Sequence, residues 1–578
     1  AMTFSLPDSP SAFAGVTWDD IQVYYRELAA RPLDGKDVEG WLRDWSRLEE
    51  LLSEAAGEAM IGYTLNTEDP AREAAHLRFS TEIIPRADEA AVVLARRLVA
   101  SGFQQPDLGP VLERFRTQIE TFREANVPLL AELEQLGTRY QKITGGMSVE
   151  WDGRPIPLPQ LQPWLRSGDR AVRERAFRSS VAPYAAARDE LAGLFTRMFR
   201  LRVDIARNAG FEDYLAYSFR TKYRFAYTAA DTARFHEAIE SVVTPAVERV
   251  YRRRAERLGL DRLRPWDTVV DPYSQEPLVP FDDVADLADR AHRVVGRVDP
   301  ELGREFGIMR TEGLLDLGSR RGKAPGGYCE TLHARGRPFI FMNAAGTLDD
   351  VMTLFHESGH AFHAFATHPL PFVWQRVTGM EAAELASMTM ELLALPHLGE
   401  SEGGFFDPVD TARARIHHLE DILVSLAHIA SVDAFQTWIY TSGAGHEAAA
   451  RDEAWLGLRE RFERGVDWTG LEQERVCRWY RQLHIFLYPF YYIEYGLAQL
   501  GALEIWRNSL EDPAGALAAY RRALALGSTR PLPAIYAAAG TRLIFDAGAV
   551  ASLVALVESQ VGAAEAELEG LCGAPGGC

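Results

Sequence analysis

The sequence predicts a mainly α-helical protein with more than one lobe. Its 578 residues are far more than one core normally organises, at roughly 100–200 residues per domain. Long segments place apolar residues at helical spacing and are rich in Ala, Leu, Glu and Arg, whereas runs typical of strands occur in only two regions. The longest helical patterns cover residues 18–58, 69–101, 108–144, 170–210 and 228–258.

Two short regions depart from the helical pattern. Residues 145–168 combine glycines and prolines with short alternating runs, which predicts a hairpin or loop inserted between helices. Residues 306–346 contain GYCETL and RPFIFMNAAG, two runs of aromatic and β-branched residues that predict a small β-sheet. We expect a lobe boundary just after the first region, near 185–195.

Composition and charge narrow the classes of function. Hydrophobic residues make up 47% of the chain and charged residues 25%, as in ordinary globular proteins. A formal net charge of −20 opposes binding to nucleic acid. Apolar runs such as AAVVLA at 90–95 are shorter than the ~20 residues of a spanning helix, so we expect no membrane partner. The first residues do not resemble a secretory signal peptide, and four cysteines in so long a chain do not suggest a disulfide framework. We therefore expect the protein in the reducing cytoplasm.

The segment TLDDVMTLFHESGHAFHAFATH, residues 347–368, carries the strongest chemical signal. Thr347 can cap a helix here, and His356 and His360 then lie about 40° and one turn apart, the spacing that lets two imidazoles bind one zinc ion. Glu357 projects beside such a metal rather than onto it, which suits a general base for water. HExxH also arises by chance, but these polar groups would be poorly satisfied against an aromatic stripe without a ligand.

A catalytic zinc site normally has a third protein ligand and an open position for water. His363 shares the helical face but lies about 10 Å along the axis from His356, so it is expected near the substrate or simply packed. The helical segment GMEAAELASMTMELL offers Glu381, Glu384 and Glu391. Glu384 and Glu391 share a face, so one can bind the metal while the other orients a histidine or an amide. Spacing alone does not choose between them.

Three segments together resemble peptidase family M3, and within it the oligoendopeptidase F-like branch: GTLDDVMTLFHESGHAFH, AELASMTMELL and YPFYYIEYGLAQLGALEIW. The resemblance covers roughly residues 200–560. The first segment is similar to the family's HExxHxxH signature, and the second to its downstream ligand glutamate, which implies Glu384 as the third ligand. Ser358 and Met390 depart from the family's usual residues, but neither stands at a ligand position.

The resemblance implies a two-lobed helical metallopeptidase with a small β-sheet beside the active-site helix and a deep substrate channel. Residues 1–190 would form an N-terminal helical region like that of oligoendopeptidase F, and residues 191–578 the zinc peptidase catalytic region. One zinc ion per chain would be held by His356, His360 and Glu384. The expected substrates are short unstructured peptides cleaved at internal bonds, and the oligomeric state stays open.

The third segment contributes tyrosines and a histidine. A tyrosine or histidine near zinc can stabilise the oxyanion that forms during amide hydrolysis, and the resemblance implies this role for side chains of the segment. Pro489 suits a helix start, and such a helix would bring three tyrosines near one face. An aromatic core stripe is the alternative, most of all for Tyr491. The predicted catalytic side chains are Glu357, His484, Tyr488, Tyr492 and Tyr495.

The loop GKAPGGY, residues 322–328, resembles a flexible family segment near the substrate. With the adjacent strand it could bind an extended peptide by main-chain pairing, and a simple turn is the alternative. Two other functions are weighed for the whole chain. A gluzincin exopeptidase, either a carboxypeptidase or an aminopeptidase, would share the zinc site. A non-catalytic scaffold braced by zinc would leave Glu357 without a task.

Overall fold

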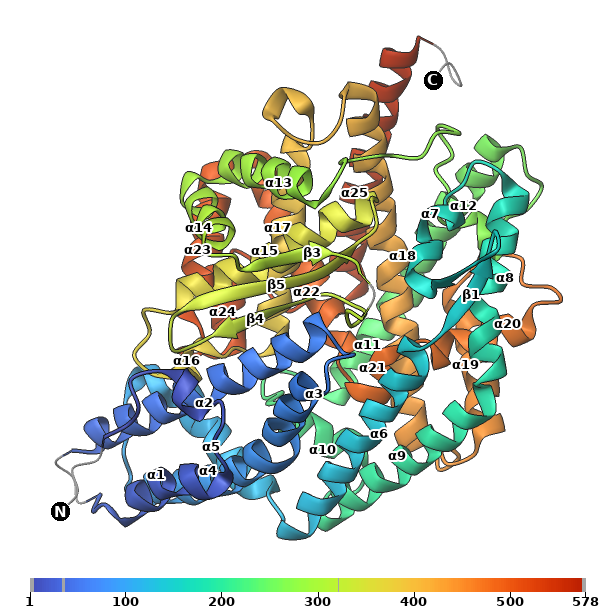
Figure 1. Ribbon diagram of the computed structural model, residues 1–578. Helices are drawn as coiled ribbons and strands as arrows, with labels where there is room; N and C mark the ends of the chain where they lie inside the picture. Colours follow the sequence, from blue (N-terminus) through green and yellow to red (C-terminus); the bar gives the residue numbers. More distant parts are fainter. Residues whose placement is uncertain (1–4, 34–36, 321, 574–578) are drawn as a thin grey trace.

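The computed structural model describes residues 5–33, 37–320 and 322–573, and most of them lie in helices (Figure 1). The predicted mainly α class is confirmed. Three of the five long helical patterns are broken into two helices, and in the other two a π-helical turn, Arg78–Ile83 or Ile239–Val243, joins one α-helix to the next. The helices of the first half are α1 (Trp18–Ala30), α2 (Val38–Leu65), α3 (Pro70–Leu77), α4 (Ile84–Ala100), α5 (Gly109–Thr121), α6 (Val127–Gly145), α7 (Gln162–Leu165), α8 (Arg170–Ala186), α9 (Arg188–Asn208), α10 (Tyr214–Thr221), α11 (Ala229–Ala238), α12 (Thr244–Leu258), α13 (Val284–Val298) and α14 (Pro300–Thr311).

The second half supplies the remaining helices, one of which carries the HExxH motif. These are α15 (Leu348–Thr367), α16 (Val373–Arg376), α17 (Met380–Ala394), α18 (Pro408–Thr441), α19 (Ala448–Phe462), α20 (Glu472–Tyr480), α21 (Leu483–Leu487), α22 (Tyr492–Glu511), α23 (Pro513–Leu526), α24 (Leu532–Ala538) and α25 (Ala547–Cys572). The motif lies on α15, as its helical pattern predicts.

The predicted hairpin is formed by β1 (Ser148–Trp151) and β2 (Arg154–Pro157), which pair antiparallel. Asp152 and Gly153 form its two-residue turn, and both have positive φ, at 50° and 77°. Asp-Gly suits this geometry because a hairpin turn of the matching twist needs two left-handed residues.

The second predicted strand region forms a three-stranded sheet in the order β3-β5-β4. Its strands are β3 (Leu315–Gly318), β4 (Tyr328–Leu332) and β5 (Arg337–Ala344). β5 pairs parallel with β3 and antiparallel with β4. The expected region began at residue 306, but residues up to 311 belong to α14. β5 is largely buried and packs against α15, so the sheet lies beside the motif helix, with α2 along β4 (Figure 1).

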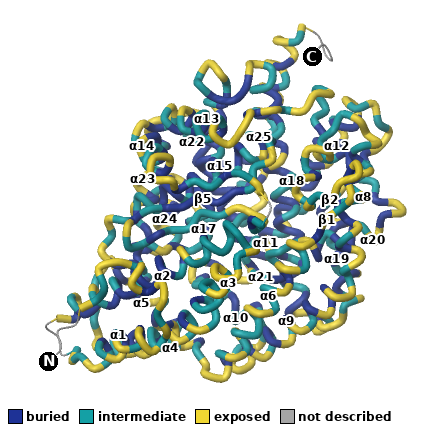
Figure 2. The backbone as a smooth tube through the Cα atoms, in the orientation of Figure 1, coloured by how far each residue is buried: buried dark blue, intermediate teal, exposed yellow. Residues whose placement is uncertain are grey.

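Three large hydrophobic cores organise the described residues, seen as dark segments in Figure 2. The first joins the sheet to α11–α15, α17, α22–α25 and the first part of α18. The second is built from α1, α2, α4 and α5, and the third joins α6, α8 and α9 to α19–α21 and the end of α18. The domain boundary at 190 stays a prediction, and the third core includes Tyr184 and Leu191 on its two sides.

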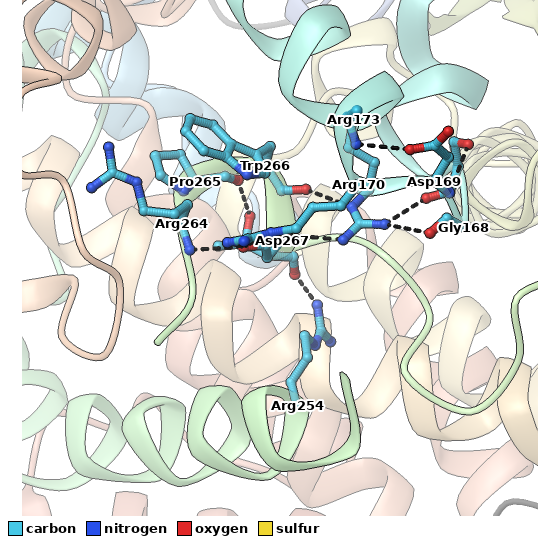
Figure 3. A network of polar contacts seen from close by, with 12 residues as sticks. Gly168, Asp169, Arg170, Arg173, Arg254, Arg264, Pro265, Trp266 and Asp267 are labelled. Atoms are coloured by element: carbon cyan, nitrogen blue, oxygen red, sulfur yellow. Dashed lines mark hydrogen bonds and ion pairs between the residues drawn. The ribbon is translucent and has the colours of Figure 1, made fainter. Parts of the chain in front are cut away.

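A buried carboxylate ties α8 to the loop that follows α12. Asp267 has no exposed surface and accepts hydrogen bonds from Arg170, from Arg173 and from the backbone N–H of Arg264 (Figure 3). Arg173 also donates to the carbonyl oxygen of Trp266 at 3.1 Å. Because a buried charge is costly unless it is paired and hydrogen-bonded, this network fixes one arrangement of the two segments.

In the described part of the chain, α18 and α25 are long and apolar enough to cross a membrane by length and composition alone. Their alanine, valine, leucine and isoleucine residues raise the mean hydropathy, although continuous apolar runs are short. The buried share of the most apolar window is 67% in α18 and 33% in α25. A core helix passes the same criterion, and the two helices pack against each other. The absence of a membrane partner stays a prediction.

The backbones of α15 and α17 approach each other closely at Gly359. A Cβ atom at this position would lie 2.5 Å from the carbonyl oxygen of Ala386 and 2.6 Å from Cα of Ser387. Both are backbone atoms, so no side-chain movement relieves the clash. Only glycine lets the two helices pack at this distance.

We therefore expect Gly359→Ala to lower the free energy of unfolding by about 1–3 kcal/mol, the usual cost of overpacking. Gly193→Ala is the matched control, because Gly193 lies in α9 and a Cβ there meets open space. Alanine should stabilise that helix by about 0.5–1 kcal/mol. Thermal and urea unfolding of both variants measure the difference, and equal stability of the two would refute the close-packing argument.

Candidate metal centre

The start of α15 is fixed by one carboxylate. Asp350 Oδ2 accepts hydrogen bonds from the backbone N–H groups of Ala345, Gly346 and Thr347, at 2.8–2.9 Å. Thr347 and Asp350 together form a capping box. The cap satisfies backbone N–H groups that would otherwise be unpaired at the helix start. It also fixes the residue at which α15 begins, which sets the direction in which the histidines point about two turns later.

Two histidines of α15 and one glutamate of α17 converge on one point. Glu384 Oε2 lies 3.1 Å from His356 Nε2 and 3.6 Å from His360 Nε2. One ligand atom from each residue lies within 4.8 Å of the others, and these three are the one such group found in the described ranges. Two imidazoles and a carboxylate are a normal donor set for zinc.

The three glutamates of α17 have separate partners, which sequence spacing left undecided. Glu391 Oε1 accepts from His356 Nδ1 at 2.6 Å, on the other side of the ring from Glu384. Its second oxygen lies 3.5 Å from His418 Nε2 on α18. Glu381 instead accepts from the hydroxyl of Tyr227 at 2.6 Å. Glu391 therefore orients His356, as carboxylates commonly do for metal-binding histidines.

The electrostatics of the cluster keep Glu384 and His360 in forms that can bind a metal. Burial raises the pKa of Glu384, but the charge of His360 and the hydrogen bond from His356 outweigh it and lower that pKa to about 2. Burial lowers the pKa of His360 to about 4, against the opposing pull of Glu384. At neutral pH Glu384 is a carboxylate and His360 a neutral imidazole, the forms that ligate. For His356, burial lowers the pKa, but the hydrogen bonds to Glu384 and Glu391 outweigh it and raise that pKa well above its usual value. A metal would therefore displace the ring proton that faces Glu384.

Glu357 is buried, with 7% of its surface exposed, and it does not belong to the converging group. Its Oε2 has no hydrogen-bond partner among the residues that the structure describes. Burial raises the pKa of Glu357 to about 7, in spite of the neighbouring His356. A buried polar atom without a partner is uncommon and marks a candidate functional group.

His363 lies on α15 but does not belong to the converging group. Its side chain is buried, and burial lowers its pKa to about 4. His363 is thus a packed side chain. As its distance from His356 along the helix predicts, it lies apart from the candidate ligands.

The prediction of a helix that starts at Pro489 is wrong. α21 ends at Leu487 and α22 begins at Tyr492, and Phe490 between them has a φ of +63°. The predicted common face of three tyrosines is therefore not formed. Tyr488 lies before the turn and is 52% exposed. A left-handed residue with a large side chain is rare, and no sequence pattern announced it.

The turn brings Tyr491, which was not in the predicted catalytic set, to the candidate ligand. Its hydroxyl donates to Glu384 Oε1 at 2.6 Å. Tyr495 Oη lies 3.4 Å from His484 Nε2, and the rings of Tyr491 and Tyr495 are 4.9 Å apart. Tyr492 instead accepts a hydrogen bond from Gln482 at 2.7 Å. The resemblance pointed to the segment, and only the turn shows which tyrosine faces Glu384.

The glycine-rich loop is anchored at several points. Lys323 donates to Asp316 Oδ1 at 2.6 Å and to the carbonyl oxygen of Gly318 at 2.7 Å. The N–H of Ala324 donates to the carbonyl oxygen of Thr64 in α2 at 2.8 Å. The loop leads into β4, an edge strand that packs against α15. β4 thus packs on the helix that carries the two histidines of the candidate metal centre.

Comparison with known proteins gives consistent matches. A sequence model described as "Peptidase family M3" matches residues 164–554. The chain is 22% identical over 426 residues to an oligoendopeptidase F homolog of Borreliella burgdorferi, covering 70% of this chain and 69% of that protein. It is 26% identical over 238 residues to the group B oligopeptidase PepB of Streptococcus agalactiae, covering 39% of this chain and 36% of that protein. The aligned part thus spans little more than a third of PepB.

Solved structures match over nearly the whole chain. A structure of PZ peptidase A with an inhibitor has a TM-score of 0.89 and 25% identity, and the match covers 94% of this chain and 97% of that chain. An X-ray structure described as oligoendopeptidase F has a TM-score of 0.89 and 27% identity, covering 96% and 98%.

The contact between Glu391 and His356 generates a test of the metal centre. We expect Glu391→Gln to weaken zinc binding by about 10–100-fold, because it removes the charge that orients the ring and raises its basicity. Competition with a chelating indicator measures the zinc Kd. Glu381→Gln on the same helix is the control, since its partner is Tyr227. Unchanged zinc affinity in Glu391→Gln would contradict the role of this carboxylate.

Proposed function

This chain belongs to peptidase family M3, and from that premise we propose that it is a zinc-dependent endopeptidase of short unstructured peptides. One observation carries the proposal. Glu384 Oε2 faces the Nε2 atoms of both His356 and His360, at 3.1 and 3.6 Å, while the neighbouring Glu357 keeps a buried oxygen without a partner in the described residues.

The residues present fit a single zinc ion. We propose His356, His360 and Glu384 as its ligands, one ion per chain, with Glu391 and Tyr491 as hydrogen-bond partners of the ligands. Bound zinc would act as a Lewis acid that polarises water and the scissile carbonyl. A site that only braces the fold would be closed by a fourth protein ligand, and the group found in the described residues has three.

The side chains around the ligands supply the proton chemistry. Glu357 is proposed as the general base that takes the proton of the attacking water and passes it to the leaving amine. Its burial suits this task because the pKa of about 7 lies close to neutral pH. Tyr495 and His484 are proposed as donors to the carbonyl oxygen as it gains charge, and burial lowers the pKa of His484 to about 4.

Two observations support short peptides as substrates: the similarity to oligopeptidases and the position of β4 at the edge of its sheet. Similarity to proteins described as oligoendopeptidase F and oligopeptidase supports cleavage of short peptides at internal bonds. β4 offers a sheet edge beside α15 to which an extended peptide can pair through its main chain. The cytoplasmic location, the lack of nucleic-acid partners and the deep channel remain predictions.

An exopeptidase with the same ligands is the alternative function. A quenched fluorescent peptide blocked at both ends distinguishes the two, because an exopeptidase needs a free terminus. Cleavage of the blocked peptide at an internal bond, located by mass spectrometry, supports the endopeptidase. Cleavage of free peptides alone, one terminal unit at a time, would favour the alternative.

We expect Glu357→Gln to keep zinc and fold but to lower kcat by at least about 10²-fold, because general acid–base catalysis contributes roughly 10²–10⁴-fold. His356→Ala should instead lose the metal itself. Elemental analysis, circular dichroism and turnover of the blocked peptide separate the two effects. Near-parental turnover of zinc-loaded Glu357→Gln would show that another group is the base.

We expect Tyr495→Phe to lower kcat by about 10²-fold with little change in KM, since the loss of one oxyanion donor costs about 10²–10³ in kcat. Tyr488→Phe is the matched control on the exposed side of the turn, and its kcat should stay within about twofold of the parent. Equal loss in both variants would remove Tyr495 from the proposed role.

A further inference from the structure

We propose that Arg224 is a positioning residue that fixes the turn before α22 and thereby places Tyr491 on the ligand Glu384. The inference rests on the proposed function for its meaning in catalysis. The contacts of Arg224 do not depend on that function, and one of the two experiments below detects them without measuring activity.

The turn adopts a backbone conformation that needs support from outside. Phe490 has a φ of +63°, a region that large side chains rarely enter and that persists only where neighbours enforce it. Two buried groups do so here. Gln436 Oε1 accepts from the N–H of Phe490 at 2.7 Å, and Arg224 Nη2 donates to its carbonyl oxygen. Both polar groups of the Phe490 backbone are thus held by other elements.

The position of Tyr491 follows from that of the Phe490 carbonyl. The peptide bond between them is planar, so a fixed carbonyl direction sets the plane from which Tyr491 leaves the chain. From there the Tyr491 hydroxyl lies 2.6 Å from Glu384 Oε1 and 3.2 Å from Met380 Sδ. One guanidinium is therefore connected, through a single peptide plane, to a candidate metal ligand.

Arg224 is itself held in one orientation. Its side chain has no exposed surface, and Nη2 also donates to Glu494 Oε1 at 3.0 Å. Lys222 Nζ lies 3.6 Å from the same oxygen and 5.4 Å from the centre of the Tyr491 ring. The guanidinium lies 4.7 Å from the centre of the Phe219 ring.

The buried ion pair between Arg224 and Glu494 is poorly suited to stabilise the fold. Among the described residues, Arg224 Nε and Nη1 and Glu494 Oε2 are buried without hydrogen-bond partners. Apolar side chains of similar volume often stabilise a fold as well as a buried ion pair does, and better than an incompletely paired one. A role in positioning the turn at Phe490 explains why a charged side chain occupies this buried site.

Arg202 provides a matched control in the same part of the chain. It is also buried and donates to carbonyl oxygens of the same segment, those of Ile485 and Phe486. Its third contact is the hydroxyl of Tyr440 at 3.0 Å. The two carbonyl bonds hold α21, before the turn. In the described residues the hydrogen bonds of Arg202 do not go to Phe490 or Tyr491, and the Tyr440 ring contacts Phe490 only at its side chain, with ring centres 5.6 Å apart.

The test is a double-mutant cycle on the zinc-loaded full-length protein. Arg224→Lys keeps the charge but loses the planar fork, and we expect it to lower kcat at least about tenfold, because misplacement near the chemistry by about 1 Å can cost 10²-fold. In the Tyr491→Phe background the same change should cost less than about twofold, since the hydroxyl through which it acts is gone. Arg202→Lys should lower kcat by the same factor in both backgrounds. Circular dichroism and melting temperature confirm that each variant is folded.

A second experiment detects the position of Tyr491 without measuring activity. In protein labelled with 3-fluorotyrosine, the ¹⁹F signal of Tyr491, assigned by its loss in Tyr491→Phe, should shift in Arg224→Lys and stay in place in Arg202→Lys. An unshifted signal, or equal kcat losses from Arg224→Lys in both backgrounds, overturns the inference. A protein without peptidase activity whose Tyr491 signal shifts as described would refute the proposed function and retain the positioning role.

Discussion

The metal centre depends on how closely α15 and α17 pack. At Gly359 the backbone of α15 nearly touches that of α17 at Ala386 and Ser387, where a Cβ atom would lie within 2.6 Å. Protein interiors are close-packed and deform little, so this contact fixes the distance between the two helices. That distance brings Glu384 within reach of both histidines. Backbone shape thus decides whether three polar side chains meet.

Close packing also buries charge, and each acid of α17 has different partners. Glu384 faces the histidines and accepts from Tyr491 and Ser387, whereas Glu391 holds the far side of the His356 ring. An unpaired buried carboxylate is costly, so specific partners hold each of these side chains in place. Glu357 departs from this rule, because Oε2 has no partner in the described residues. That exception is what a base awaiting water and substrate would show.

Buried arginines hold segments that connect the longer helices. Arg173 joins α8 to the loop at Asp267, as Figure 3 shows. Arg202 and Arg224 donate to carbonyl oxygens at two places in the segment that leads into α22, Arg202 in α21 and Arg224 at Phe490. A guanidinium carries five N–H donors in a planar fork, so one side chain can satisfy carbonyls that no helix or strand pairs. Irregular backbone next to the metal centre is thereby given one conformation.

The sequence by itself determined the helical class, the strand regions, the HExxH helix and the short set of glutamates that could complete the site. These features are local, because periodicity, caps and turn residues act within a few positions of the chain. Spacing along the chain left Glu384 and Glu391 open and the resemblance implied Glu384, but only the tertiary structure brings Glu384 to both histidines. Tertiary structure alone decided that Tyr491 rather than Tyr488 turns inward. The physical reason is that both outcomes rest on contacts between distant segments. Glycine at 359 sets the approach of two helices, and the turn at Phe490 is held by side chains from α18 and from the loop after α10.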